Sequence, residues 1–145
     1  SQLFVTILFM EDTRLDIPAI ADNLKKIRKF VRNYIAKCDR LESFSDEIVL
    51  AIDEACQNVV RHAYKDKEGD VTVKLSFRNN EFIVSIEDNG IPVIPEKIKP
   101  RDIEDIKPGG LGTFFINQIM DSVSFQLTSP HWVNCLTMKK KLNNK

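Results

Sequence analysis

The sequence predicts an α+β domain, a two-layer α/β sandwich in which helices pack on one face of a mixed, mostly antiparallel sheet. Two long segments carry apolar residues at helical spacing, and several shorter segments have the composition or the alternation of strands. Short turns join consecutive strands, which favours antiparallel neighbours. The length of 145 residues suits a single domain, 1–145.

The first third of the chain is expected to hold a strand and a helix. The run Leu3–Phe9 is rich in β-branched and aromatic residues, as strands are. A helix is predicted over 18–37, with Pro18 at its first position, where proline is tolerated. Its polar face is basic and is either a solvated surface or a docking surface. The cations of this face are Lys25, Lys26, Arg28, Lys29 and Arg32.

A second helix is predicted over 45–65, behind a capping box made by Ser43 and Asp46. The rest of the chain has the patterns of strands, turns and one further helix. The expected elements are strands 71–77 and 82–86 joined at Asn79-Asn80, a proline-rich connection over 90–108, a helix from Gly109 to about Ser122, and strands 123–128 and 132–139 that turn at Ser129-Pro130.

The charge balance and the cysteines limit the function classes. Lys and Arg total 21, as do Asp and Glu, which argues against a dedicated nucleic-acid binder and a polybasic membrane-surface protein. The apolar run Leu3–Met10 is too short to span a bilayer and is not expected to be a signal peptide. The three cysteines are widely spaced and are expected to be reduced packing thiols in a cytoplasmic protein.

Three polar clusters are candidates for chemistry, and the first lies on the second predicted helix. Glu54, Asn58 and His62 recur every four residues, which places them in one row, with Arg61 beside it. A carboxamide oxygen suits Mg²⁺, which takes few protein ligands when phosphate and water supply the others. A carboxylate one turn away can accept a proton from an attacking hydroxyl or water. An ordinary polar helix face is the alternative.

The other two clusters are turns. Asp88 begins the turn Asp88-Asn89-Gly90-Ile91-Pro92, and its carboxylate suits the exocyclic amine of adenine and repels the carbonyl of guanine. Gly90 is expected to permit a positive φ and a close approach of a ligand. The second turn, Gly109-Gly110-Leu111-Gly112-Thr113, opens a predicted helix whose free N–H groups suit an anion. The chain has neither a P-loop pattern nor a dinucleotide-binding pattern, and each turn alone is also a common loop.

Taken together and in this order, the clusters resemble the GHKL, or Bergerat-fold, ATPase superfamily, and within it the anti-sigma-factor serine/threonine kinases. The N-box of that family is matched by residues 53–64, the G1 box by 87–92 and the G2 box by 109–112. The resemblance extends from about Ile17 to Lys139. It implies a histidine-kinase-like ATPase fold.

The resemblance also implies roles for individual residues. Glu54 would be the general base, Asn58 the Mg²⁺ ligand and Asp88 the adenine anchor. Arg28 would contact a protein partner. Further contacts with ATP are implied for Arg61, His62, Gly90, Pro92, Gly109, Gly110, Leu111, Gly112 and Thr113.

By the same resemblance, the protein would transfer the γ-phosphoryl group of ATP, with Mg²⁺, to an anti-anti-sigma (STAS) protein. It would sequester a sigma factor by partner switching and form a homodimer. From its charge balance, it is expected to contact neither nucleic acid nor a membrane. Several alternatives stay open. They are a nucleotide-gated binding module without transfer, a kinase with a partner other than a sigma factor, the ATP-binding half of a sensor histidine kinase, and a structural protein without a ligand.

Overall fold

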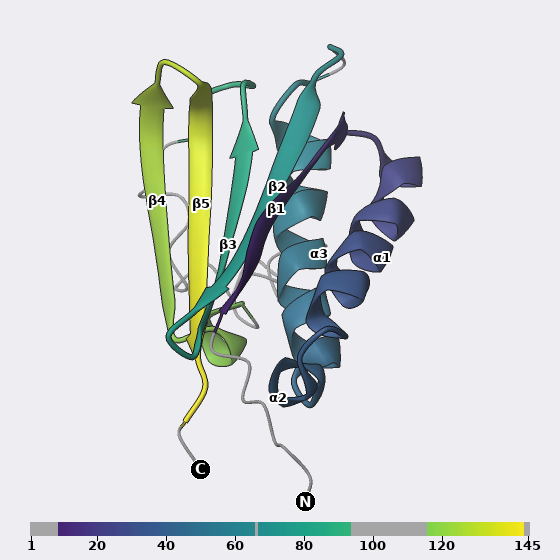
Figure 1. The fold of residues 1–145 in the computed structure, drawn as a ribbon. Coiled ribbons are helices and arrows are strands. Elements are labelled where there is room, and N and C mark those ends of the chain that lie inside the picture. The colour runs from purple at the N-terminus through teal and green to yellow at the C-terminus, as the bar shows by residue number, and fades with distance from the viewer. Residues whose placement is uncertain (1–8, 66, 94–115, 144–145) are drawn as a thin grey trace, which may run out of the picture.

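The protein forms two layers, a five-stranded sheet and a set of helices on one of its faces (Figure 1). The structure is a computed structural model, and it describes residues 9–65, 67–93 and 116–143. In chain order the elements are strand β1 (Phe9–Pro18), the 3₁₀-helix η1 (Ala21–Asn23), helices α1 (Leu24–Ile35), α2 (Asp39–Glu42) and α3 (Ser45–His62), and strands β2 (Asp70–Arg78), β3 (Glu81–Asp88), β4 (Ser122–Ser129) and β5 (Trp132–Lys141). The predicted α+β sandwich is confirmed.

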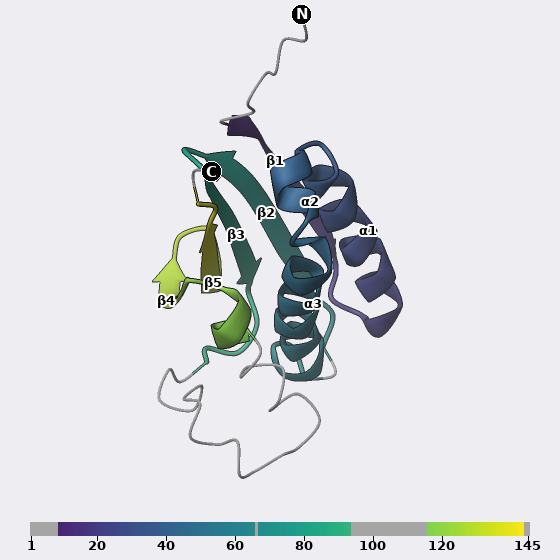
Figure 2. The same cartoon turned by 90° about the horizontal axis from the view of Figure 1, so that it is seen from below.

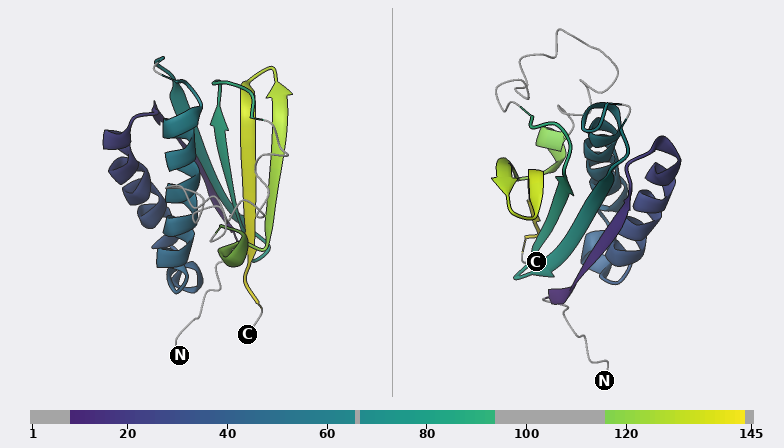
Figure 3. Two further views of the ribbon diagram at one scale, coloured as in Figure 1. Left: turned by 180° about the vertical axis from the view of Figure 1, so that it is seen from behind. Right: turned by 90° about the horizontal axis from the view of Figure 1, so that it is seen from above.

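The sheet has the strand order β1-β2-β3-β5-β4, so β3 is its middle strand. All neighbouring pairs in the described part of the chain are antiparallel. Figure 2 shows α1 and α3 side by side on one face of this sheet, and both views of Figure 3 agree. None of the helices in the described ranges is long and apolar enough to cross a membrane.

The core lies between α1, α3 and the inward face of the sheet. Strands β2 and β3 alternate buried and partly exposed side chains, so that every second residue points at the helices. Phe77, Phe82, Val31 and Ile48 are among the side chains that are fully buried there. Burial of such side chains contributes about 1.5–3 kcal/mol each, which fixes α3 against the middle of the sheet.

Both predicted hairpins are confirmed, with the second turn one residue later than predicted. Asn79 and Asn80 have φ values of 52° and 62°, as the two central residues of a type I′ turn require, and they join β2 to β3. Strands β4 and β5 pair from Ser129 and Trp132, which leaves Pro130 and His131 as their two-residue loop. Positions 109–115 of the third predicted helix lie outside the described residues, and residues 116–119 are helical.

The first strand differs from the prediction. All of the expected strand Leu3–Phe9 except Phe9 lies outside the described residues, and the observed strand β1 continues to Pro18. It is an edge strand, and its exposed positions carry charged residues such as Glu11 and Asp12. Charged residues on an edge strand protect it from pairing with other chains. Because these charged residues interrupt the apolar pattern, the strand cannot be recognised in the sequence from a run of apolar residues.

Two helix starts also differ from the prediction. Pro18 ends β1 instead of beginning a helix, and its carbonyl oxygen accepts a hydrogen bond from Asn23 Nδ2 at 2.9 Å. Ser43 does not cap α3, because its hydroxyl donates to the carbonyl oxygen of Arg40 at 3.0 Å and Phe44 occupies the N-cap position. The short helix α2 was not predicted, since four residues are too few for a periodic pattern.

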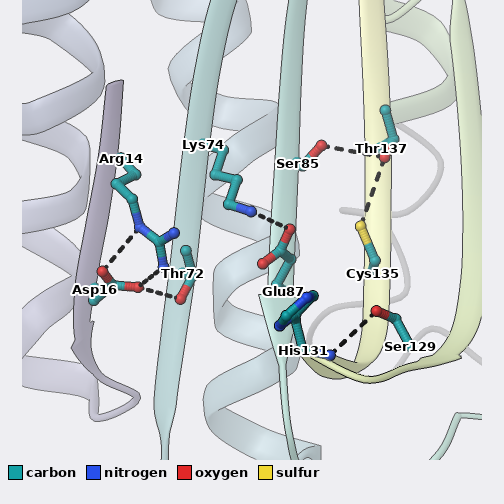
Figure 4. A network of polar contacts seen from close by, with 10 residues as sticks. All are labelled: Arg14, Asp16, Thr72, Lys74, Ser85, Glu87, Ser129, His131, Cys135 and Thr137. Atoms are coloured by element: carbon teal, nitrogen blue, oxygen red, sulfur yellow. Dashed lines mark hydrogen bonds and ion pairs between the residues drawn. The ribbon is translucent and has the colours of Figure 1, made fainter. Parts of the chain in front are cut away.

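The outward face of the sheet is polar, and several of its charges are paired within it (Figure 4). Arg14 binds Asp16 at 2.7 Å, and Lys74 binds Glu87 at 3.0 Å. Cys135 lies on this face, while Cys38 and Cys56 are in the core, and all three are free and buried. Burial raises the pKa of the Cys56 thiol, which therefore stays protonated and unreactive, as expected of a packing residue.

The packing predicts different costs for two Leu→Ala substitutions. Leu41 of α2 is fully buried, whereas Leu50 of α3 is 42% exposed. We expect Leu41→Ala to lower the free energy of unfolding by about 2–5 kcal/mol, and the matched control Leu50→Ala to change it by about 0.5 kcal/mol or less. Urea unfolding followed by circular dichroism measures both. Equal losses in the two variants would contradict this account of the core.

Candidate functional site

A cavity of about 310 Å³ opens between α3 and the inward face of the sheet, near the end of β3. Most of its wall is apolar, and four polar side chains line the rest. Volume and composition are those of a small-molecule site, in which a few polar groups orient a ligand held mainly by apolar contact. The lining residues are Ala55, Asn58, Val59, His62, Ala63, Ile86, Asp88, Val93, Phe125, Asn134 and Leu136.

The turn after β3 touches the C-terminal end of α3, and a glycine makes this contact possible. A Cβ atom on Gly90 would lie 2.1 Å from the carbonyl oxygen of Ala63, and the N–H of Ile91 donates to that oxygen at 2.6 Å. The expectation of a positive φ at Gly90 is wrong, because its φ lies outside the left-handed region. Gly90 is required there because helix and turn approach too closely for any side chain.

Asp88 is the charged group of the cavity. It is only 6% exposed, and its Oδ1 accepts hydrogen bonds from Gly90 N at 2.9 Å and Asn134 Nδ2 at 2.8 Å. Its Oδ2 has no partner among the residues that the structure describes. Burial raises the pKa of Asp88, and the two hydrogen bonds offset part of this rise. The free oxygen is therefore an acceptor without a donor from the described residues, in a mostly apolar site.

Asn58 and His62 lie one turn apart on α3, and both line the cavity. Neither side chain makes a hydrogen bond to another described residue. A free carboxamide oxygen fits Mg²⁺, which binds one or two protein oxygens and takes phosphate and water for the rest. The described chain holds no cluster of three or more His, Cys, Asp or Glu side chains suited to a metal. Such a cation would therefore depend on Asn58 and on a phosphate ligand.

Glu54 lies one turn before Asn58 and does not line the cavity itself. Its Oε2 is buried and has no hydrogen-bond partner within the described ranges. An unpaired buried carboxylate oxygen is costly, and native proteins keep few of them. Of the predicted row, Asn58 and His62 therefore line the cavity, and Glu54 lies beside it.

Arg61 and Arg28 are joined through two other side chains. Arg28 of α1 binds Asp53 of α3 at 2.9 Å, and Gln57 Nε2 donates to the other carboxylate oxygen of Asp53 at 2.8 Å. Arg61 in turn donates to Gln57 Oε1 at 2.7 Å. Arg61 is exposed and does not line the cavity. These contacts connect the basic face of α1 to Asp53, the residue that precedes Glu54.

The structure thus brings together Asn58, His62, Asp88 and Gly90 out of the predicted site. Pro92 is exposed next to this group. The predicted anion turn lies outside the described residues, and its members are Gly109, Gly110, Leu111, Gly112 and Thr113.

Several lining residues were not singled out from the sequence. Asn134 is 2% exposed and lies among apolar side chains on the inward side of β5. Its signal in the sequence was a polar residue in phase with Leu136 and Met138, at a position where the alternation calls for an apolar one. Phe125 from β4 and Val93 after the turn carry no such signal, because only the fold brings them to the cavity.

The chain is similar to known proteins in sequence and in fold. A family model described as the histidine kinase-like ATPase domain matches residues 17–140. Proteins named serine-protein kinase RsbW, from Bacillus mycoides and Bacillus thuringiensis, are 29% identical to this chain over 121 residues, which is 78% of this chain and 76% of each relative.

Two solved structures share the fold. One contains the RsbU and RsbW domains of a Mycobacterium tuberculosis protein and matches with a TM-score of 0.66 at 16% identity, covering 94% of this chain and 34% of that one. This chain therefore spans about a third of that protein's length. The other is the histidine kinase domain of a blue-light activated histidine kinase from Erythrobacter litoralis, with a TM-score of 0.55 at 20% identity, over 87% and 62% of the two chains.

Proposed function

Because the chain belongs to the histidine kinase-like ATPase domain family, we propose that it binds ATP in the cavity beside α3 and transfers the γ-phosphoryl group to a serine or threonine of a protein partner. One observation carries the nucleotide assignment: the unpaired acceptor Asp88 Oδ2 stands in an otherwise mostly apolar cavity. The relatives named as serine-protein kinases support the type of transfer.

Asp88 would recognise the base. Its free oxygen accepts a hydrogen bond from the exocyclic amine of adenine, while guanine presents a carbonyl oxygen at the same place and is repelled. Ile86, Phe125 and Leu136 give the base an apolar wall. A hydrogen bond to an ionised acceptor contributes about 1.5–3 kcal/mol, which is enough to select one purine over the other.

The phosphates would lie toward Asn58. Bound Mg²⁺ supplies charge neutralisation for the phosphoryl group in transfer. Asn58 would hold that ion, and His62 and Arg61 would lie near the phosphates or the waters of the metal. The backbone N–H groups of 109–113 would donate to the phosphates, as the sequence motif suggests.

Glu54 would be the general base. It lies one turn from Asn58, and its buried oxygen is free to accept a proton. In the reaction, the hydroxyl oxygen of the partner attacks the γ-phosphorus. The bond between the γ-phosphorus and the oxygen that bridges it to the β-phosphorus breaks, and ADP leaves. The hydroxyl proton passes to Glu54. Positioning and charge neutralisation contribute most to such a transfer, and the base completes it.

The proposed partners are an anti-anti-sigma (STAS) protein as the substrate and a sigma factor that is bound and released. We place the protein in the cytoplasm as a homodimer, without direct contact with nucleic acid or membrane. The exposed cations of α1 suit an acidic partner surface, and Arg28, which is half-buried and bound to Asp53, lies beside them. The Asp53–Gln57 contacts connect this face to the helix that carries Glu54.

The role of Glu54 predicts a kinase defect without a binding defect. We expect Glu54→Gln to slow phosphoryl transfer by about 10²–10⁴-fold, as is usual for loss of a general base, with ATP affinity within about twofold of wild type. Radiolabelled ATP and a candidate STAS protein measure transfer, and calorimetry measures affinity. Glu47→Gln, an exposed glutamate on the same helix, is the control. Equal transfer rates in the two variants would contradict the assignment of Glu54 as the general base. ATP binding without any transfer by the wild type would favour the binding module.

The role of Asp88 predicts a change in base selection. Gly90 N–H and Asn134 Nδ2 both donate to one side of residue 88, so in Asp88→Asn they hold the amide oxygen and turn the NH₂ group toward the cavity. That group repels the adenine amine and suits the guanine carbonyl. We expect ATP affinity to fall about 10–100-fold and the preference for ATP over GTP to be lost. Titration with both nucleotides tests this, and unchanged affinities would refute the assignment.

The docking role of Arg28 predicts a defect in partner binding without a defect in ATP binding. We expect Arg28→Ala to weaken binding of a STAS protein and of a sigma factor encoded nearby by about tenfold, as for a well-placed interface arginine. Lys29→Ala removes an equal charge from the same helix and is the control. Surface plasmon resonance with ATP or ADP present measures both, and calorimetry checks that ATP affinity stays unchanged. Wild-type binding of both partners by Arg28→Ala would count against this surface.

A further inference from the structure

Two ion pairs join α1 to α3, which lie side by side (Figure 2). Arg28 Nη1 binds Asp53 Oδ1 at 2.9 Å, and Arg32 Nη1 binds Asp46 Oδ1 at 3.0 Å. The earlier residue of α1 pairs with the later residue of α3, as expected of helices that run antiparallel. We call the strip between these two pairs, with Leu50 in it, the α1–α3 seam.

Leu50 lies between the two ion pairs on the surface of α3. Asp46, Leu50 and Asp53 are four and three residues apart, so their side chains leave the same side of the helix. Leu50 is 42% exposed, whereas its neighbours Val49 and Ala51 are buried. A single exposed leucine is common on a protein surface, but this one stands between two arginines that bind its own helix.

Both arginines keep most of their hydrogen-bond donors open. Each reaches a carboxylate of α3 through Nη1, and Arg32 Nη1 also lies 3.4 Å from Ser45 Oγ. The Nη2 and Nε groups of Arg28 and Arg32 have no partner among the described residues. A guanidinium can bind a second carboxylate through such an open edge. Because the arginines are one helical turn apart, the seam offers two carboxylate sites that start from Cβ atoms about 5–6 Å apart.

The two ion pairs differ in how firmly they are held. The side chain of Asp53 is 13% exposed, and its Oδ2 accepts a hydrogen bond from Gln57 Nε2 at 2.8 Å. The side chain of Asp46 is 93% exposed, and an ion pair at such a site contributes little to stability. Arg28 is therefore held in one orientation, whereas Arg32 can exchange Asp46 for the carboxylate of a ligand at little cost.

The charges around the seam favour an acidic ligand. Helix α1 carries five cations and no acidic residue between Leu24 and Ile35, although acids and bases are equal in number in the whole chain. A helix with two acidic residues four positions apart and an apolar residue on the same face complements two arginines and a leucine. Amphipathic helices bind to other proteins through anchors at this spacing.

We propose that the α1–α3 seam is the docking surface for an acidic amphipathic helix of the protein that carries the acceptor hydroxyl. Its carboxylates would bind Arg28 and Arg32, and its apolar residue would pack on Leu50. The proposal rests on the proposed function, namely transfer of a phosphoryl group to a protein. Asp53 directly precedes Glu54 in α3, so a protein docked on the seam lies against the helix that carries the proposed general base.

The test uses two variants of the seam and two matched controls. Leu50→Ala removes the apolar centre, and Leu127→Ala is its control, because Leu127 is 40% exposed on strand β4. Arg32→Ala removes one carboxylate site, and Lys26→Ala removes an equal charge from another side of α1. Surface plasmon resonance with a candidate STAS protein measures docking. Calorimetry with ATP and thermal unfolding check that the nucleotide site and the fold are intact.

We expect Leu50→Ala to weaken binding of the STAS protein about tenfold, as for loss of two buried methylene groups. Arg32→Ala should weaken it about three- to tenfold, mainly through slower association that depends less on salt. Both controls should bind within about twofold of wild type, and all four variants should keep wild-type ATP affinity. Equal binding by Leu50→Ala and Leu127→Ala would overturn the proposal. So would loss of sigma-factor binding with STAS binding intact, since the seam would then have another occupant.

A second readout uses the wild-type chain. Oxidation of Leu50 by hydroxyl radicals, measured by mass spectrometry, is expected to fall when the STAS protein binds, while oxidation of Leu127 stays the same. Unchanged oxidation of Leu50 would overturn the proposal. Light scattering tests for a second copy as the occupant, and a lower mass of Leu50→Ala with full STAS binding would overturn it too. A wild-type chain that binds ATP but no STAS protein would instead overturn the proposed substrate, and the seam assignment with it.

Discussion

The buried carboxylate of Asp88, at the end of the middle strand, is the constraint around which this site is organised. A charge in an apolar setting is tolerated only when hydrogen bonds replace much of its lost hydration. Gly90 and Asn134 supply two donors to one oxygen, and the raised pKa reflects the hydration that is not replaced. A ligand that brings a donor to the other oxygen completes the set. The affinity for such a ligand and the selectivity for its base thus both arise from the incomplete solvation of the Asp88 carboxylate.

The position of α3 depends on a contact that a side chain at Gly90 would prevent. The turn lies against the carbonyl oxygen of Ala63, and Tyr64 extends the contact by accepting a hydrogen bond from Asn89 N–H at 2.9 Å and donating to the carbonyl oxygen of Asp70 at 2.6 Å. The end of α3, the start of β2 and the turn after β3 are therefore joined at one point. This fixes the rotation of α3, and that rotation is what turns Asn58 toward the cavity.

Elements with a strong periodic pattern could be predicted from the sequence, and those defined by tertiary contacts could not. Helix α3 and both hairpins follow from spacing and from the Asn79-Asn80 turn. Most of strand β1 was not predicted, because its charged residues suit an edge, which is a property of the sheet as a whole. Asp88 was predicted from its turn, but its partner Asn134 lies 46 residues away and becomes its neighbour only when β5 pairs with β3.

Unpaired polar groups indicate a binding site only where several of them occur together. Two buried side-chain atoms in the described chain lack a hydrogen bond, the Tyr34 hydroxyl and Glu54 Oε2. Tyr34 packs against Phe82 at the start of β3, about 20 Å along the strand from Asp88, and burial raises its pKa to about 12, so it is an inert phenol. Glu54 instead lies one helical turn from Asn58. Asn58 lines the cavity, and so does Asp88, which has an open acceptor there. An isolated unpaired group is a packing cost, whereas several that converge form the unfilled half of a binding site.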